Sequence, residues 1–163
     1  MKTLFAALLL TACVGCFSGK DKAVAPTAKP AQDIRATMEH NTVIMNQMIA
    51  LQDRLAGNYS RELFYENAGL GDIAPETTSE LQAKIATEEK EFIARRKEPE
   101  VHACFTTTIP GTALKAAISA GQLTLGEVQT YDETMRSYSV SAHAATEQAT
   151  RYHAIHGYSK ATQ

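Results

Sequence analysis

The chain lacks tryptophan, has only three cysteines among its 163 residues, and carries none of the common catalytic signatures. A nucleophile elbow (G-x-S-x-G), a P-loop, an H-E-x-x-H zinc motif and a dinucleotide-binding glycine fingerprint are all absent from the sequence. Gly69-Leu70-Gly71 is predicted to be a turn rather than a phosphate cradle. Because these motifs supply the usual reacting groups, their absence predicts a protein that is not an enzyme and that carries no cofactor.

Charge of neither sign dominates, since 16 basic and 18 acidic side chains give a formal net charge of −2. A nucleic-acid-binding domain would show a basic stripe, and we expect no such partner here. The one basic cluster, Arg95-Arg96-Lys97, lies among acidic residues: Glu88, Glu89, Glu91, Glu98 and Glu100. We interpret this run, with Lys90, as a solvated helix face on which nothing tunes a carboxyl pKa for acid–base chemistry.

Long apolar runs are also scarce, and the clearest one extends from Leu4 to Leu10 after the positive charge of Lys2. A membrane-spanning helix needs about 20 residues, so this shorter run fits the hydrophobic region of a signal peptide instead. The next segment, Leu10-Thr11-Ala12-Cys13, has an apolar residue three positions before the cysteine and a small residue directly before it. It resembles the lipobox of bacterial lipoproteins.

The resemblance implies that the signal is removed before the cysteine, that its thiol receives a diacylglyceryl group, and that the new amino terminus is acylated by a chain such as palmitate. Cys13 fits best, but Val14 and Gly15 also make Cys16 suitable, with a signal of more typical length. In Gram-negative lipoproteins an aspartate just after the cysteine favours the inner membrane. Because that position is Val14 or Phe17 here, the resemblance implies the outer membrane, with the domain on its periplasmic face.

The choice of cysteine has a chemical consequence. If Cys13 carries the lipid, Cys16 and Cys104 remain as thiols in an oxidising compartment and could form a disulfide. If Cys16 carries the lipid, Cys13 leaves with the signal and Cys104 is solitary.

Composition divides the chain into a signal peptide (1–12), a lipidated amino terminus with a flexible tether (13–30), and a helical domain (31–163). The tether is mostly polar or small and contains Pro26 and Pro30, so it has too little apolar surface to fold alone. The remaining residues suit a single domain.

Apolar spacing predicts a first helix over 31–56, which ends at Gly57-Asn58, and a short helical segment over 60–68 that Gly69 and Gly71 terminate. The stripe of the first helix contains Ile34, Met38, Asn41, Ile44, Met45, Met48, Leu51 and Leu55.

After Pro75, the pattern Thr77-x-x-Glu80 is a capping box that predicts the start of another helix. Its apolar stripe contains Leu81, Ile85, Phe92 and Ile93. Since a residue before proline is pushed out of the helical region, this helix should end near Glu98.

Residues 100–110 are predicted to be a connection packed on the core, and 112–120 a short helix that ends at Gly121. A second capping box, Thr124-x-x-Glu127, starts a long helix that continues to Gly157. Its seam follows alternating steps of three and four residues: Val128, Tyr131, Met135, Tyr138, Ala142, Ala145, Ala149 and Tyr152.

We therefore predict an all-α fold, a small antiparallel helical bundle with one long C-terminal helix. A helix of about 32 residues spans about 48 Å, which is longer than the other predicted helices. Part of the seam is thus expected to overhang and to offer a surface to a partner helix or to a second copy of the chain.

His153 and His156 lie three residues apart on one face of this helix, so both imidazoles could reach one metal ion. His143 is ten residues before His153, about 15 Å along the axis, and too distant to join them. Completion of a site requires a ligand from elsewhere, such as His102, Cys104 or His40. Surface histidines without a metal are the alternative interpretation.

His102-x-Cys104 places a thiol near an imidazole, the pair that a cysteine nucleophile requires. No third residue that would orient the pair is marked in the sequence, and a buried or disulfide-bonded cysteine is the commoner outcome.

The sequence favours a membrane-anchored envelope lipoprotein that acts as a non-enzymatic accessory or interaction subunit of an envelope complex, or as a surface exclusion factor. The alternative is a periplasmic lipoprotein that binds a metal or ligand through the C-terminal histidines.

Overall fold

The computed structural model describes residues 31–71, 73 and 76–157. This part of the chain is all-α, without a strand, and ends in a single long helix, as predicted. Its helices are α2 (Ala31–Asn67), α3 (Thr78–Arg96), α4 (Pro99–Thr106), α5 (Gly111–Ser119) and α6 (Leu125–His156). No helix among these residues combines the length and the apolar character needed to cross a bilayer. The signal peptide, Cys13, Cys16, the tether and Pro75 lie outside the described residues.

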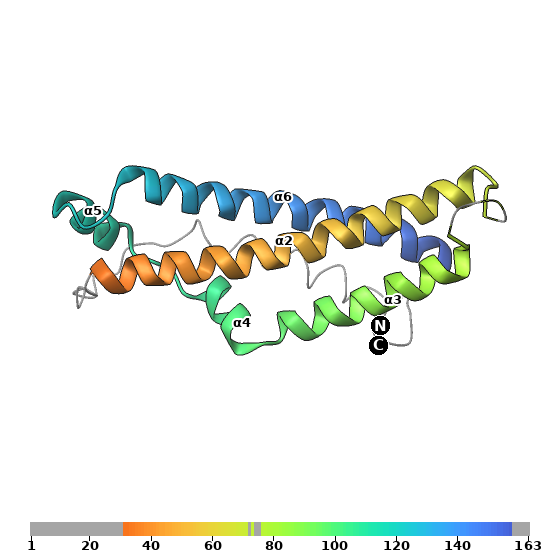
Figure 1. Ribbon diagram of the computed structural model, residues 1–163, viewed down its shortest axis with the longest axis horizontal. Coiled ribbons are helices and arrows are strands. Elements are labelled where there is room, and N and C mark those ends of the chain that lie inside the picture. Colours follow the sequence, from red (N-terminus) through yellow and green to blue (C-terminus); the bar gives the residue numbers. More distant parts are fainter. Residues whose placement is uncertain (1–30, 72, 74–75, 158–163) are drawn as a thin grey trace.

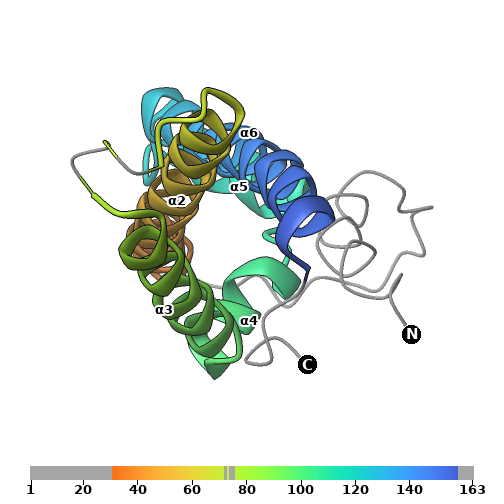
Figure 2. The ribbon, with the colours of Figure 1, turned by 90° about the vertical axis from the view of Figure 1, so that its right-hand side faces the viewer.

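The long helices α2, α3 and α6 form the bundle, and successive long helices run in opposite directions (Figure 1). Because α3 returns along α2, helices α2 and α6 run parallel, with Arg35 beside Glu127 at one end and Glu62 beside His156 at the other. We call these the near end, where α2 and α6 begin, and the far end, where both finish and α3 begins. The short helices α4 and α5 connect α3 to α6, and Figure 2 shows the bundle along its length.

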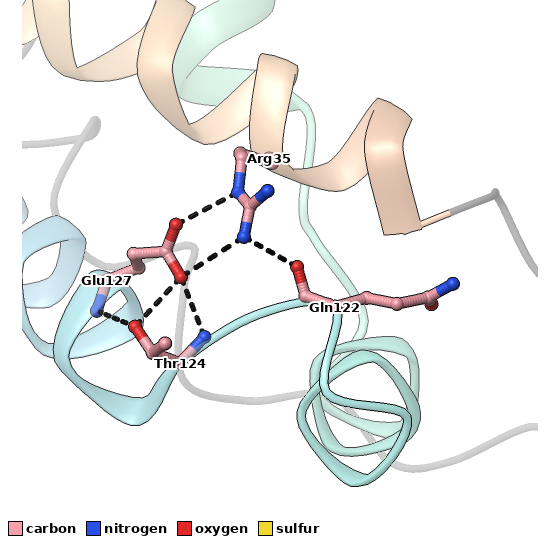
Figure 3. A network of polar contacts seen from close by, with 4 residues as sticks. All are labelled: Arg35, Gln122, Thr124 and Glu127. Carbon is pink, nitrogen blue, oxygen red and sulfur yellow. Dashed lines mark hydrogen bonds and ion pairs between the residues drawn. The ribbon is translucent and has the colours of Figure 1, made fainter.

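The near end is held by the N-terminus of α6 and by Arg35 of α2 (Figure 3). The predicted capping box is present, since the Glu127 amide donates to Thr124 Oγ1 at 3.2 Å and the Thr124 amide donates to Glu127 Oε2 at 2.7 Å. Arg35 donates to Glu127 Oε1 at 2.9 Å and to the Gln122 carbonyl at 2.7 Å. The contacts hold the start of α2 against the start of α6.

The predicted end of the first helix at Gly57-Asn58 is wrong, because α2 continues to Asn67. Glycine costs a helix interior about 1 kcal/mol, and tertiary contacts beyond it outweigh that cost. Asn58 is buried and donates to Glu88 Oε2 of α3 at 2.6 Å, while Tyr59 and Leu63 enter the core. The helix stops where the chain turns at Gly69, which has a left-handed φ of +64°.

The heptad seam of α6 packs against α2 within the chain. Its members contribute to three core clusters: Val128 and Tyr131; Met135, Tyr138 and Ala142; Ala149 and Tyr152. The expectation that this seam overhangs is wrong, because α2 has 37 residues and α6 has 32. This error arises because the sequence analysis ended the first helix at Gly57-Asn58 and so made it shorter than the C-terminal helix.

Residues 100–110 are not simply a connection, because Pro99–Thr106 forms α4. Proline suits the first position of a helix, where its missing N–H is not needed. Val101 is 0% exposed, and Cys104 packs beside it in the central cluster. One apolar turn in eight residues is too short to establish a helical period, which explains why the sequence pattern missed it.

The remaining boundaries agree with the sequence within one or two residues. α3 ends at Arg96 with Lys97 as its cap, just before Pro99, and its capping box at Thr77 and Glu80 is present. α5 leads to Gly121, whose φ is +67°.

Candidate functional site

The far end of the bundle contains polar side chains where an apolar core would be expected. The innermost group, which we call the buried triad, contains Tyr59 of α2, Glu89 of α3 and His153 of α6. Glu89 Oε1 accepts a hydrogen bond from the Tyr59 hydroxyl at 2.6 Å and lies 2.6 Å from His153 Nε2. The side chains of His153 and Glu89 are only 6% and 7% exposed. All three long helices therefore meet at one carboxylate oxygen.

The surroundings of His153 favour its charged form. Its Nδ1 lies 2.9 Å from the Gly157 carbonyl oxygen, which can only accept, so Nδ1 carries a hydrogen. Burial lowers the pKa of His153, but the hydrogen bonds to Glu89 and Gly157 and the charge of Glu89 outweigh it, so the net pKa is raised. Both ring nitrogens of His153 thus face acceptor oxygens, which favours the imidazolium form, and the Tyr59 phenol is a further donor to Glu89. Burial and Glu89 raise the pKa of Tyr59 far above its ordinary value, which keeps this phenol protonated.

The prediction that Glu89 lies on a solvated face is wrong. Glu91 is exposed and pairs with Arg54 at 3.3 Å, as a surface residue should, but Glu89 is buried. The sequence did contain a signal, because Glu89 follows Leu81 and Ile85 at four-residue steps and so continues their buried stripe.

A second polar group lies nearer the surface, and we call it the carboxylate–histidine site. It contains Glu62 and Glu66 of α2 and His156 of α6, whose ligand-type atoms all lie within 4.8 Å of one another. His156 Nε2 lies 2.9 Å from Glu62 Oε2 and 2.9 Å from Glu66 Oε2. The Glu62 side chain is 1% exposed, His156 20% and Glu66 41%, so the site is buried on one side and open on the other.

Two neighbours orient this site. Gln82 of α3 donates to Glu62 Oε1 at 3.0 Å, which leaves Oε2 directed to His156. The Tyr152 ring lies between the two polar groups, with its centroid 4.6 Å from that of His156 and 5.1 Å from that of His153. Burial and three nearby carboxylates raise the pKa of Tyr152 to about 12, so its phenol is neutral.

His153 and His156 therefore meet different carboxylates, although the sequence predicted that both could face one metal ion. Of the ligands expected to complete a site, His40 and His102 are exposed elsewhere and Cys104 lies in the central core; His143 is exposed as well. Within the described residues, the ligand-type side chains around His156 are instead Glu62 and Glu66. The sequence pattern did not connect them to the first helix, because 60–68 was predicted as a separate short helical segment after the stop at Gly57-Asn58.

Cys104 is not arranged as a nucleophile. Its Sγ lies 3.7 Å from the Asn41 carbonyl oxygen in the core, while His102 is exposed on α4. Burial raises the pKa of the Cys104 thiol to about 11, which disfavours the reactive thiolate. The suggested bond to Cys16 stays a prediction, as does lipidation of Cys13 or Cys16.

A groove of about 500 Å³ lies between the last turns of α2 and α6, at the same end of the bundle as the two polar groups. Phe64 and Ile155 are 59% and 51% exposed and both line this groove. The groove is lined by Ser60, Leu63, Phe64, Asn67, Gln148, Arg151 and Ile155.

These features define the far end as the candidate site, with a buried triad, an open carboxylate–histidine site and a groove between α2 and α6. Comparison of the chain with protein families, with characterised proteins and with solved structures finds no match.

Proposed function

We propose that this chain is a lipid-anchored envelope protein whose helical domain acts as a non-enzymatic interaction subunit. It serves an envelope complex as an accessory, pilot or assembly component, or acts at the surface as an exclusion factor. The lipobox-like segment ending at Cys13 supports the anchor, and the balanced charge and missing catalytic motifs support the non-enzymatic role.

The observation that carries the proposal is the groove at the far end. A chain anchored near its amino terminus approaches the bundle at Ala31, and a helix of 37 residues extends about 55 Å from there. The groove lies beside the last turns of α2, and so at the end remote from the anchor. Its lining combines the apolar Leu63, Phe64 and Ile155 with the polar Ser60, Asn67 and Gln148, and protein interfaces combine apolar and polar groups in the same way.

The occupant that fits is an amphipathic helix of an envelope protein, since a channel between two parallel helices accepts a third one with its apolar face inward. Leu63, Phe64 and Ile155 would contact that face, and the Arg151 guanidinium, already paired with Glu147, would lie at the rim.

The anchor is tested by mass spectrometry of the mature amino terminus. We expect a diacylglyceryl thioether and an acylated amine on Cys13, lost in Cys13→Ser and retained in Cys16→Ser. The reverse pattern would assign the lipid to Cys16, and an unmodified amino terminus in protein that washes off membranes would overturn the anchor.

The groove is tested separately by a photo-crosslinking amino acid placed at Phe64 in cells. Val43 is the matched control, because it lies on the same helix with a similar exposure of 55%. We expect a discrete crosslinked product from Phe64 that is absent from Val43 and is lost when Ile155→Asp is added. Equal products from both positions, or none from Phe64, would contradict a partner in the groove.

A further inference from the structure

The carboxylate–histidine site has a shortage of donors that the buried triad does not have. In the triad, one carboxylate oxygen of Glu89 receives hydrogen bonds from a phenol and an imidazole. At Glu62 and Glu66 the relation is reversed, because two carboxylate oxygens lie 2.9 Å from the single atom His156 Nε2. One imidazole N–H has one hydrogen and cannot serve both oxygens fully. The two carboxylate groups therefore have fewer hydrogen-bond donors than acceptor oxygens at this site.

Beyond the proposed interaction role, we propose that Glu62, Glu66 and His156 form a binding site for a divalent transition-metal ion, with Zn²⁺ as the preferred occupant. A divalent ion in place of the shared hydrogen would bond to all three atoms at once. Two carboxylate oxygens and one imidazole nitrogen are ligands that zinc accepts, at about 2.0–2.2 Å each. Imidazole among the ligands favours Zn²⁺ and its neighbours over Mg²⁺ and Ca²⁺, which prefer oxygen alone.

The distances are close to those of a bound site. Ligand atoms of a tetrahedral zinc ion lie about 3.3 Å apart, as follows from bond lengths near 2 Å. The two contacts of His156 Nε2 at 2.9 Å would lengthen slightly, and the carboxylate oxygens lie within 4.8 Å of each other. Side-chain rotations of Glu66, which is 41% exposed, are sufficient for that change.

The surroundings resemble those that support metal ligands. Glu62 is oriented through its other oxygen by Gln82, and the ring of His156 packs on Tyr152. Hydrogen bonds to ligating carboxylates and fixed imidazole rings raise metal affinity in proteins. The exposed side of Glu66 leaves a path for the ion and a fourth position for water.

Occupancy would also join α2 to α6, since Glu62 and Glu66 lie on α2 and His156 lies on α6.

The test is titration of the purified full chain with Zn²⁺, followed by calorimetry for affinity and by thermal unfolding for stability. We expect one ion per chain and an increase in Tm, since a ligand that prefers the native state stabilises it. His156→Ala and Glu66→Gln should each weaken binding at least tenfold, because removal of even a supporting residue costs about 10–100-fold. Glu66 is exposed, so Glu66→Gln tests the site without a risk to folding.

The matched controls are His143→Ala and Glu147→Gln, which change the same residue types at exposed positions of α6. Both should bind Zn²⁺ as the unchanged chain does. No increase in Tm with Zn²⁺ would overturn the proposal, as would equal affinity in the unchanged chain and the His156→Ala and Glu66→Gln variants. Loss of Zn²⁺ binding with intact crosslinking from Phe64 would separate this site from the interaction role.

Discussion

The two ends of the bundle are stabilised by different chemistry. From the near end to the middle, α2 contributes apolar side chains such as Met45 and Met48, which pack with Val101 and Ala142 of other helices. The polar Asn41 in this region is satisfied by Tyr131, at 3.3 Å. At the far end the same helix contributes Tyr59 and Glu62 to the interior. One helix thus keeps a mainly apolar inner face along its length and adds a buried phenol and a buried carboxylate at the far end.

The comparison separates residues that serve folding, such as the apolar core, from the buried polar groups of the far end, which folding alone does not require. Apolar burial gives about 25 cal/mol per Å² without special geometry, and it occurs along the whole bundle, including Leu55, Leu81 and Ile85 at the far end. Buried charges contribute less stability than well-packed apolar groups of similar size. A paired charge cluster at the far end, where an open acidic site and a groove also lie, is better explained by binding than by folding.

The largest loss of stability at the far end is expected from Glu89→Ala. It leaves the Tyr59 hydroxyl and a charged His153 buried without their shared acceptor, which should cost about 3–5 kcal/mol of unfolding free energy. Glu91→Ala, two residues later and exposed, should change it by less than about 0.5 kcal/mol. Chemical denaturation of both variants gives the comparison, and similar small losses would show that the triad is not a stabilising contact.

Met48→Ala tests the apolar half of the comparison. Met48 is 0% exposed, and its truncation should cost about 2–5 kcal/mol through lost burial and a residual cavity. The loss should be independent of pH, since no titratable group is removed. Val43→Ala, on the exposed face of the same helix, should be nearly neutral in denaturation experiments. A pH-dependent loss in Met48→Ala would mean that the two ends are coupled.

Stability at the far end should depend on pH through His153. Its pKa is raised in the folded chain, so its stabilising contribution is complete below its unfolded value of about 6.5 and is lost as pH rises through the folded value. The unfolding free energy of the unchanged chain should therefore decrease from about pH 6.5 upward. His153→Gln should flatten that slope and His143→Gln should not. An unchanged slope in His153→Gln would contradict the imidazolium assignment.

The smallest expected change in unfolding free energy is at Gln52, in the middle of α2. Gln52 is 1% exposed, and within the described chain both polar atoms of its side chain lack a hydrogen-bond partner. Because unsatisfied buried amides are costly, Gln52→Met should raise the unfolding free energy by about 1 kcal/mol. Thermal unfolding measures it, and a decrease in Tm would mean that the amide has a partner, such as a buried water.

Local signals predicted the elements well and the site poorly. The capping boxes at Thr77 and Thr124 correctly predicted where two helices start, because a capping box depends only on residues three positions apart. The false stop at Gly57-Asn58 depended on contacts from α3, 30 residues away, which no local pattern contains. Residues 60–68 were predicted as a separate short helix, so the buried stripe of α2 was not followed from Leu55 through Tyr59 to Glu62. The seam of α6 was correct as a buried face, but its partner could not be chosen without the true length of α2.

The central claim is that the far end of the bundle is a binding end, and its most direct test is anomalous X-ray diffraction at the zinc edge from crystals grown with Zn²⁺. We expect one strong peak bounded by Glu62 Oε2, Glu66 Oε2 and His156 Nε2. Peaks confined to the exposed His40, His102 or His143, with none at this position, would contradict it.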